Sequence, residues 1–322
     1  MITPPVISAS ANASADLPLA VGPAMTATGG QVGITTLIAA GRLDDRMLDS
    51  VRSALADAGI RVGELSWIDA GDAADLGFEG EAAAARDALS KIDGLDFAIR
   101  LGERVPARLF VADMDSTMIG QECIDELADY AGLKDEVAAI TEQAMLGELD
   151  FAASLAERVA LLKGLHHQVI AKCRRARIRP NPGAATLVAT MKRHGALTVL
   201  VSGGFTDFVR PIARNLGFQR LRANYLGVKD GRLTGTTVGA IVDAQAKRRL
   251  AEQILDGLGA GPEALVAIGD GANDVPLITL AGLGVGYRPK PALAEVADGL
   301  IRHHDLTALL WMQGIPRRDW SI

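Results

Sequence analysis

After residue 105 the chain contains three short apolar runs that each end abruptly in polar residues. The runs begin at Leu109, Ala196 and Ala264 and consist mainly of Leu, Val, Ile and Ala. Uninterrupted apolar runs of this length are typical of parallel strands buried on both faces. Helical periodicity lies between them, at 185–194 and from Asp243 onward. The alternation predicts an α/β fold with a parallel sheet, whose ligands bind at the carboxyl ends of the strands.

The first part of the chain, 31–104, shows a smaller alternation of the same kind. It predicts strands at 32–38, 61–68 and 95–100 and helices at 45–58 and 80–92. We find no nucleophile–base pair, phosphate-binding loop or ligand cluster in this sequence. We therefore expect a small α/β module for binding or packing, which ends at 103–107 with Pro106.

The stretch 120–182 has a helical pattern, which Pro180 and Pro182 end. Because it interrupts the α/β alternation, we expect a helical insertion there, with the core formed by 105–119 and 183–322. Residues 1–30 are rich in Ala, Ser, Thr and Pro and lack the basic start of a signal peptide. They predict a disordered leader.

The amino-acid composition narrows the classes of protein to which this chain can belong. The 322 residues are 49% hydrophobic and 22% charged, as in an ordinary globular protein, and the net charge is −6. This charge favours neither nucleic acid nor an anionic membrane as partner, and no apolar run is as long as a membrane span. Two distant cysteines, Cys123 and Cys173, favour a reduced, cytoplasmic protein. A homodimer is compatible with the sequence, which carries no signal for oligomeric state.

Polar residues that could take part in catalysis follow each of the three predicted core strands. The polar groups are Asp113 and Asp115 after the first, Ser202 and Gly203 after the second, and Asp270, Asn273 and Asp274 after the third. Neighbouring carboxylates stay ionised only beside a cation or hydrogen-bond donors, and a Ser with glycines can cradle a phosphate. Each loop alone could be an ordinary turn. Their convergence at one sheet edge instead favours a Mg2+ site and phosphoryl transfer.

Three charged residues stand out on predicted helices. Lys247 projects to the middle of an apolar helix face, so we expect it to meet an anion. Arg158 lies inside an apolar arc and needs an anionic partner, either a protein carboxylate or a ligand. Glu122 lies on the polar face of its helix, where the pattern favours a solvated acid near the helix start.

These motifs resemble those of the haloacid dehalogenase superfamily. The similarity rests on four segments in order: Asp113 to Thr117, Ser202 to Phe205, Lys247, and Gly269 to Asp274. The segments 147–151 and 158–164 and the hairpin before Lys247 are similar to the phosphoserine phosphatase family in particular. The resemblance covers about 109–310 and implies a Rossmann-like core. Residues 31–104 are only weakly similar to the small amino-acid-binding (ACT-like) modules that precede such enzymes.

The resemblance implies a role for each matching position. Asp113 would be the nucleophile and Asp115 the general acid/base, whose backbone carbonyl also helps to bind Mg2+. Asp270 would complete the protein ligands of the metal. The remaining implied positions are the phosphate-binding residues Ser202, Gly203 and Lys247, the supporting residues Asn273 and Asp274, Glu122 for a substrate ammonium, Arg158 for its carboxylate, and Met145 and Phe151 on the apolar side of the insertion.

The implied reaction is hydrolysis of O-phospho-L-serine, the last step of serine biosynthesis, through an aspartyl phosphate. The insertion would then close over a small-molecule substrate as a lid. Met114 replaces the Phe that is common between the two aspartates, and we expect its side chain to pack away from the site. Two alternatives stay open: a phosphatase for another small phosphate such as phosphothreonine, and a non-catalytic amino-acid sensor. An autophosphorylating transport ATPase would need membrane spans.

Overall fold

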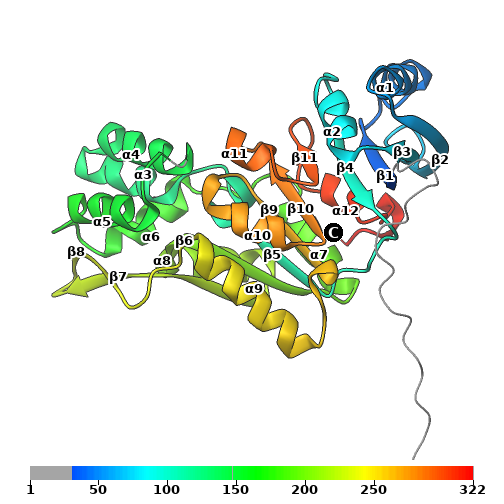
Figure 1. Ribbon diagram of the computed structural model, residues 1–322. Coiled ribbons are helices and arrows are strands. Elements are labelled where there is room, and N and C mark those ends of the chain that lie inside the picture. The colour runs from blue at the N-terminus through cyan, green and yellow to red at the C-terminus, as the bar shows by residue number, and fades with distance from the viewer. Residues whose placement is uncertain (1–30, 147, 322) are drawn as a thin grey trace, which may run out of the picture.

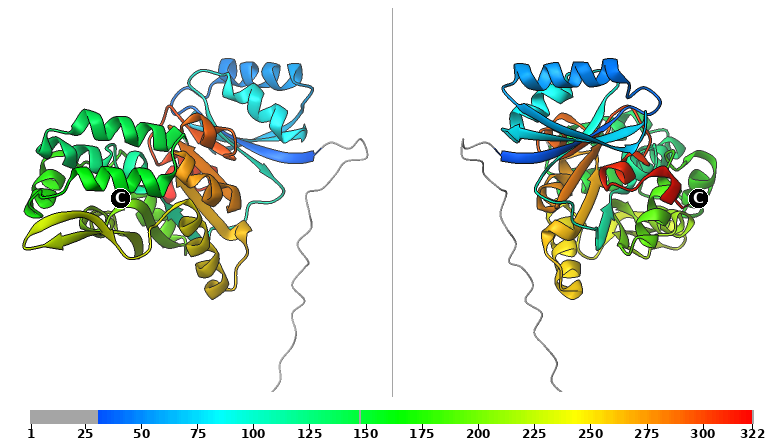
Figure 2. Two further views of the ribbon diagram at one scale, coloured as in Figure 1. Left: turned by 60° about the vertical axis from the view of Figure 1, so that its left-hand side comes forward. Right: turned by 90° about the vertical axis from the view of Figure 1, so that its right-hand side faces the viewer.

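The computed structural model describes residues 31–146 and 148–321, so the expected leader at 1–30 lies outside the described residues. Their strands form one sheet of eleven strands in the order β2-β3-β1-β4-β11-β10-β9-β5-β6-β7-β8. Helices lie on both sides of this sheet (Figures 1 and 2). The fold is therefore α/β, as the sequence predicts.

The core carries the strands that the apolar runs predict. Its elements are β5 (Leu109–Ala112), α7 (Ala184–Arg193), β6 (Leu197–Phe205), α8 (Thr206–Leu216), β7 (Arg220–Lys229), β8 (Arg232–Val238), α9 (Ala244–Leu258), β9 (Leu265–Gly269), α10 (Val275–Leu280), β10 (Leu283–Tyr287), α11 (Pro291–Ala294), β11 (Gly299–Ile301) and α12 (Ala308–Met312). The strands β11, β10, β9, β5, β6 and β7 run parallel to one another. The three predicted strands, β5, β6 and β9, are direct neighbours in the sheet.

Four helices make up most of the insertion. They are α3 (Cys123–Ala128), α4 (Lys134–Leu146), α5 (Phe151–Leu161) and α6 (Gln168–Arg177). An isolated bridge between Ile119 and Pro180 brings the outgoing and returning chain side by side. The insertion thus leaves the core directly after β5 and returns beside its own starting point, at one end of the molecule (Figure 1).

The N-terminal module lies at the other end of the molecule (Figure 1). Its elements are β1 (Gln31–Ile38), α1 (Asp45–Asp57), β2 (Arg61–Asp69), β3 (Ala73–Gly80), α2 (Ala82–Ser90) and β4 (Asp96–Leu101). Strand β4 pairs antiparallel with β11 of the core, through Ala98 and Phe97. The module therefore extends the core sheet.

Strand β3 is absent from the sequence prediction, which leaves 73–79 as a loop and begins a helix at Gly80. The structure pairs β3 with β1 and β2, and the helix begins at Ala82. Leu76 and Phe78 are buried, but Gly77 and Gly80 lie beside them. Because glycine has a low strand propensity, the local pattern concealed this strand.

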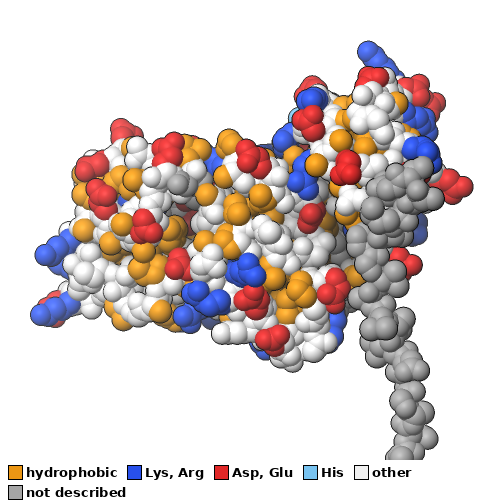
Figure 3. All heavy atoms as spheres, viewed as in Figure 1, with side chains coloured by type: hydrophobic (Ala, Val, Ile, Leu, Met, Phe, Trp, Pro, Cys, Tyr) orange, Lys and Arg blue, Asp and Glu red, His pale blue; other side chains and the backbone are white. Residues whose placement is uncertain are grey.

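Surface charge is mixed. In the face shown in Figure 3, acidic and basic side chains alternate over the core, the insertion and the module. No helix of the described residues is long and apolar enough to cross a membrane.

Candidate active site

The ends of β5, β6 and β9 bring Asp113, Ser202 and Asp270 to one edge of the sheet. The registers place Ala112 opposite both Leu200 and Ile268, so these neighbouring strands end nearly level with one another. The predicted convergence is therefore present. Strand β6 continues beyond its predicted end at residue 201 to Phe205, with a register irregularity between Val201 and Phe205.

A group of carboxylates lies at the centre of this edge. Oxygens of Asp113, Asp270 and Asp274 lie within 4.8 Å of one another, and all three residues are buried. The hydroxyl of Thr117 donates to Oδ1 of Asp270 (2.8 Å), and the Asp270 amide donates to Oδ2 of Asp274 (3.3 Å). Oxygen ligands at this spacing are suited to a hard divalent cation.

Lys247 is the cation that this group contains. Asp243 caps helix α9 by accepting from the Ala246 amide (2.7 Å), which places Lys247 in the first turn, 1% exposed. Its Nζ lies 2.9 Å from Oδ1 of Asp113 and 2.7 Å from Oδ1 of Asp274. Burial alone would lower the pKa of Lys247, but the two carboxylates raise it above its usual value. The expectation that this lysine meets an anion is confirmed.

The acids at this edge carry more negative charge than Lys247 can balance. Burial first, and then Asp274, raise the pKa of Asp113 to about 7. Burial and nearby acids also raise the pKa of Asp115 and Asp270 well above the ordinary range. Oδ1 of Asp115 and Oδ1 of Asn273 are buried and have no hydrogen-bond partner in the part of the chain that the structure describes. A divalent cation beside these oxygens would remove the charge excess, so the residues fit such an ion.

The turn after β5 connects Asp115 with Glu122. Ser116 has a left-handed backbone (φ 55°) and donates its hydroxyl to Oε1 of Glu122 (2.5 Å). Glu122 is half-buried, and its pKa is raised, first by burial. The interpretation of Glu122 as a solvated acid is therefore wrong. The turn folds the start of α3 back over the strand end, which the helix pattern alone does not reveal.

The glycines after Ser202 allow a close approach of three segments. Oγ of Ser202 accepts from the Gly204 amide (2.8 Å). A Cβ on Gly203 would lie 2.5 Å from the Phe151 ring, and one on Gly204 would lie 3.0 Å from Oδ2 of Asp115. A side chain at Gly203 would therefore clash with Phe151, so this part of the insertion packs directly against the loop after Ser202.

Asn224, on β7, is a supporting residue that sequence reasoning missed. It is 2% exposed, and its Nδ2 donates to the Gly203 carbonyl (2.8 Å) while its Oδ1 accepts from the Val242 amide (2.8 Å). Asn224 thereby holds the loop after Ser202. An asparagine within a strand was the available signal for such a role. Its hydrogen-bond partners, however, lie far away in the chain, so the sequence does not identify them.

Arg158, on α5, is 5% exposed and its nitrogens bond to neutral groups. Nε donates to the Ser154 carbonyl (3.1 Å), and Nη1 donates to Oγ1 of Thr141 (3.0 Å). Among the described residues no carboxylate lies within ion-pair distance of its guanidinium. Of the two partners that the sequence left open, an anionic ligand is the one this geometry favours. The Met145 side chain lies outside the described residues. Met114 is fully buried, but its Cε would lie 3.6 Å from a Cβ on Gly204, so it packs beneath the loop after Ser202 rather than away from the site.

The insertion also contacts the core directly. Nζ of Lys290, which precedes α11, lies 2.6 Å from Oε1 of Glu142 on α4, and the Lys290 amide donates to the Asp270 carbonyl (2.8 Å). A second contact is formed by Nε2 of His167, which lies 2.9 Å from Oδ1 of Asp207 on α8. The insertion is thus joined to the core at two places.

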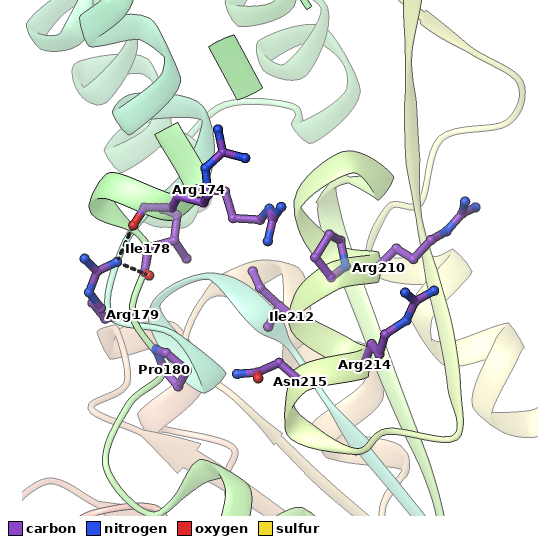
Figure 4. Close-up of a pocket in the computed structure, with 10 residues that line it drawn as sticks. Arg174, Ile178, Arg179, Pro180, Arg210, Ile212, Arg214 and Asn215 are labelled. Carbon is purple, nitrogen blue, oxygen red and sulfur yellow. Dashed lines mark hydrogen bonds between the residues drawn. The ribbon is translucent and has the colours of Figure 1, made fainter. Parts of the chain in front are cut away.

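A cavity of about 810 Å³ lies elsewhere, between α6 and α8 (Figure 4). Five arginines, two prolines, two isoleucines and one asparagine line it. The side chains of Arg210 and Arg214 extend away from α6 (Figure 4). Because the lining offers no carboxylate, thiol or hydroxyl, this cavity lacks the groups that a nucleophilic reaction needs.

Comparisons with known proteins agree with this geometry. The model of the haloacid dehalogenase-like hydrolase family matches residues 110–279. Over 228 residues the chain is 44% identical to a phosphoserine phosphatase of Streptomyces coelicolor, covering 70% of this chain and 55% of that protein. It is 47% identical to a phosphoserine phosphatase of a Polaromonas species, covering 63% of this chain and 88% of that protein.

Solved structures show the same similarity. A structure of a phospho-aspartyl intermediate analogue of phosphoserine phosphatase matches 65% of this chain and 99% of its own, with 40% identity and a TM-score of 0.62. A probable phosphoserine phosphatase from Vibrio cholerae matches 88% of this chain and 86% of its own, with 31% identity and a TM-score of 0.69. A match of that extent includes part of the N-terminal module.

The matches differ in how much of each relative they cover. The matched part of this chain spans 55% of the Streptomyces coelicolor protein and 60% of a phosphoserine phosphatase of Archaeoglobus fulgidus. The family model, by contrast, covers more than half of this chain, including most of β5 and all of β6, β9 and Lys247. The chain belongs to the haloacid dehalogenase-like hydrolase family.

Proposed function

We propose that this chain hydrolyses O-phospho-L-serine to L-serine and phosphate, with Mg2+ as cofactor. The observation that carries the proposal is the buried guanidinium of Arg158, which has no carboxylate partner among the described residues and belongs to the segment that covers the carboxylate cluster. A substrate carboxylate would supply the direct anionic partner that this cation lacks among the described residues. The names of the relatives support the same substrate.

In the first step an oxygen of Asp113 attacks phosphorus, and the serine oxygen leaves. Lys247, 2.9 Å from Asp113, reduces the repulsion between the carboxylate and the phosphate oxygens. Burial and the nearby Glu122 raise the pKa of Asp115, which favours its protonated form, and in that form it can donate a proton to the leaving oxygen. The products of this step are an aspartyl phosphate and L-serine.

In the second step water attacks the aspartyl phosphate. Asp115, now ionised, accepts a proton from this water, and phosphate leaves with Asp113 restored. The hydroxyl of Ser202 and the backbone amide of Gly203 are assigned to the phosphate oxygens. The insertion, acting as a lid, limits the access of other water to the intermediate.

We assign the metal as Mg2+ because all of its candidate ligand atoms are oxygens. Asp113, Asp270 and the backbone carbonyl of Asp115 would hold the ion, with Asp274 and Asn273 in support. When bound, it supplies positive charge that counters the developing charge on the phosphoryl group. The charge excess of the buried acids is the structural support for this assignment.

Substrate recognition is assigned to the insertion. Arg158 takes the carboxylate of the substrate, Glu122 takes its ammonium, and Phe151 and Met145 form the apolar side. We accordingly assign 31–104 to an accessory module, 105–119 and 183–322 to the catalytic core, and 120–182 to the lid. Both cysteines are free and buried, which supports a cytoplasmic location.

The test is phosphate release from L-phosphoserine, phosphothreonine and an aryl phosphate, each with Mg2+ and with chelator. We expect Mg2+-dependent turnover with a clear preference for phosphoserine. Equal use of phosphothreonine would replace the proposed substrate with a broader class. Absence of turnover on all three would favour the non-catalytic sensor.

A further inference from the structure

We propose that Thr141 is a positioning residue that orients Arg158 toward the substrate carboxylate and so determines the preference for amino-acid phosphates. This inference rests on the proposed function of Arg158. Thr141 lies on α4, whereas Arg158 lies on the neighbouring helix α5. The interaction therefore joins two helices of the insertion.

Arg158 is held at two of its three nitrogens. The Ser154 carbonyl, one helical turn earlier, accepts from Nε (3.1 Å), and Oγ1 of Thr141 accepts from Nη1 (3.0 Å). A contact at Nε alone leaves the side chain free to rotate about its last bonds. Because the guanidinium is planar, a second contact at Nη1 also defines the plane. Its remaining N–H groups are the ones available for a carboxylate.

Thr141 is itself held in one orientation. It is 4% exposed, and its Oγ1 lies 2.7 Å from Oδ1 of Asp125 on α3 and 2.9 Å from the Val137 carbonyl. A hydroxyl has one hydrogen, which we assign to the Asp125 carboxylate as the nearer and stronger acceptor. A lone pair of Oγ1 then points to Arg158. Asp125, Thr141 and Arg158 form a chain across three helices.

The chain through Thr141 explains how a buried arginine stays available to a ligand. Asp125 lies near enough to act on Arg158 electrostatically, since Arg158 lowers the pKa of this carboxyl that burial otherwise raises. Yet the hydroxyl of Thr141 stands between them, so no ion pair forms among these residues. A direct ion pair would occupy the N–H groups that the substrate carboxylate needs.

The test compares L-phosphoserine with an aryl phosphate that lacks a carboxylate. We expect Thr141→Val to raise KM for phosphoserine roughly tenfold to a hundredfold, as for a lost hydrogen bond to a charged group. Its kcat/KM for the aryl phosphate should stay within about threefold, which also shows that the variant is folded. Thr141→Ser keeps the hydroxyl and should restore the wild-type KM.

Two further variants separate positioning from packing. Thr190→Val removes a buried hydroxyl of helix α7, which lies in the core and outside the insertion. It should leave the substrate preference unchanged. In an Arg158→Ala background, Thr141→Val should cause less than about a twofold further loss on phosphoserine, because both changes remove the same interaction.

Each outcome has a distinct meaning. Any of three results would overturn the role of Thr141. These are equal losses on both substrates, a KM that Thr141→Ser does not restore, and losses that add to those of Arg158→Ala. If Thr141→Val does not fold, the comparison of Thr141→Ser with Thr141→Ala decides in the same way. A wild-type enzyme without preference for phosphoserine would instead overturn the proposed function, and this inference with it.

Discussion

At the scale of single residues, this site is defined by buried charges that only partly balance. Lys247 contacts Asp113 and Asp274, while Asp115 and Asp270 keep raised pKa values. Such an excess of buried negative charge is costly unless a cation or substrate relieves it. The predictions at this scale therefore concern what each carboxyl does in the reaction and in folding.

Asp113→Asn should abolish turnover and formation of the aspartyl phosphate, because an amide oxygen is a poor nucleophile. Rapid acid quenching with labelled phosphoserine, followed by gel separation, would detect the intermediate in wild type and not in the variant. Mass spectrometry is the control for deamidation back to Asp. Near-normal turnover by the variant, with its amide intact, would contradict the assignment of the nucleophile.

Asp115→Asn should slow turnover by roughly 10²- to 10⁴-fold, the usual span for general acid–base catalysis. The loss should shrink for an aryl phosphate with a good leaving group, since that group needs no proton in the first step. Steady-state rates on both substrates provide the measurement. A rate equal to wild type on phosphoserine would remove Asp115 from this role.

Without metal, the protein should lose stability as pH rises from about 4 to above 7. Burial raises the pKa of Asp113 to about 7, and those of Asp115 and Asp270 well above the ordinary range. The folded state then holds more protons than the unfolded state, so the free energy of unfolding falls as pH rises through the raised pKa values.

Urea unfolding at pH 5 and pH 8 in chelator would measure this loss. Mg2+ should restore stability at pH 8, because it binds the folded state. Asp270→Asn removes one of the carboxyls whose pKa is raised. Its free energy of unfolding should therefore differ less between the two pH values. Greater stability at pH 8 than at pH 5 in chelator would contradict the electrostatic account.

At the scale of elements, helix α4 connects the insertion to the core in two ways. Thr141 faces Arg158 within the insertion, and the next residue, Glu142, forms an ion pair with Lys290 of the core (2.6 Å). The Lys290 amide also bonds to the Asp270 carbonyl. Closure of the insertion is thereby linked to the loop that carries a predicted metal ligand.

Lys290→Met should weaken this closure slightly and raise KM for phosphoserine by up to about fivefold. Exposed ion pairs contribute about 0.2–1 kcal/mol, and salt screens them, so the effect should shrink at high ionic strength. Lys91→Met, which removes an exposed ion pair with Asp87 in the N-terminal module, is the matched control. An unchanged KM at low salt would show that the pair does not hold the lid.

Elements were predictable where the local pattern is strong. The apolar runs and the helix at Lys247 were correctly placed because a strand buried on both faces, or an amphipathic helix, has a pattern of its own. Strand β3 was missed because its glycines weaken that pattern and its pairing with β1 and β2 decides its conformation. Tertiary contacts overrode propensity there.

At the scale of the whole molecule, one continuous sheet joins the N-terminal module to the core. Buried Asp96 on β4 reinforces the junction, since it accepts from the amides of Arg302, His303 and His304 and from Nδ1 of His304. Nε2 of His304 in turn accepts from the Ala40 amide (2.9 Å). The module and the core should therefore unfold together.

Asp96→Asn should lower the stability of the whole chain by about 2–4 kcal/mol, because an amide NH2 would face backbone N–H donors. Calorimetry should show one transition in wild type and one transition at lower temperature in the variant. Asp93→Asn, an exposed position just before β4, is the control. Two separate transitions, or an unchanged Tm, would contradict coupling through Asp96.

The α/β class, three core strands and the polar groups at their carboxyl ends could be predicted from the amino-acid sequence, because they depend on local periodicity and on the residue types next to each strand. The inward direction of Lys247 could be predicted for the same reason. Three further features became visible in the three-dimensional structure: Arg158 lacks a carboxylate partner among the described residues, Thr141 and Asn224 bond to Arg158 and to the Gly203 carbonyl, and the module shares the core sheet. Those features depend on contacts between residues far apart in the chain, which no local pattern records.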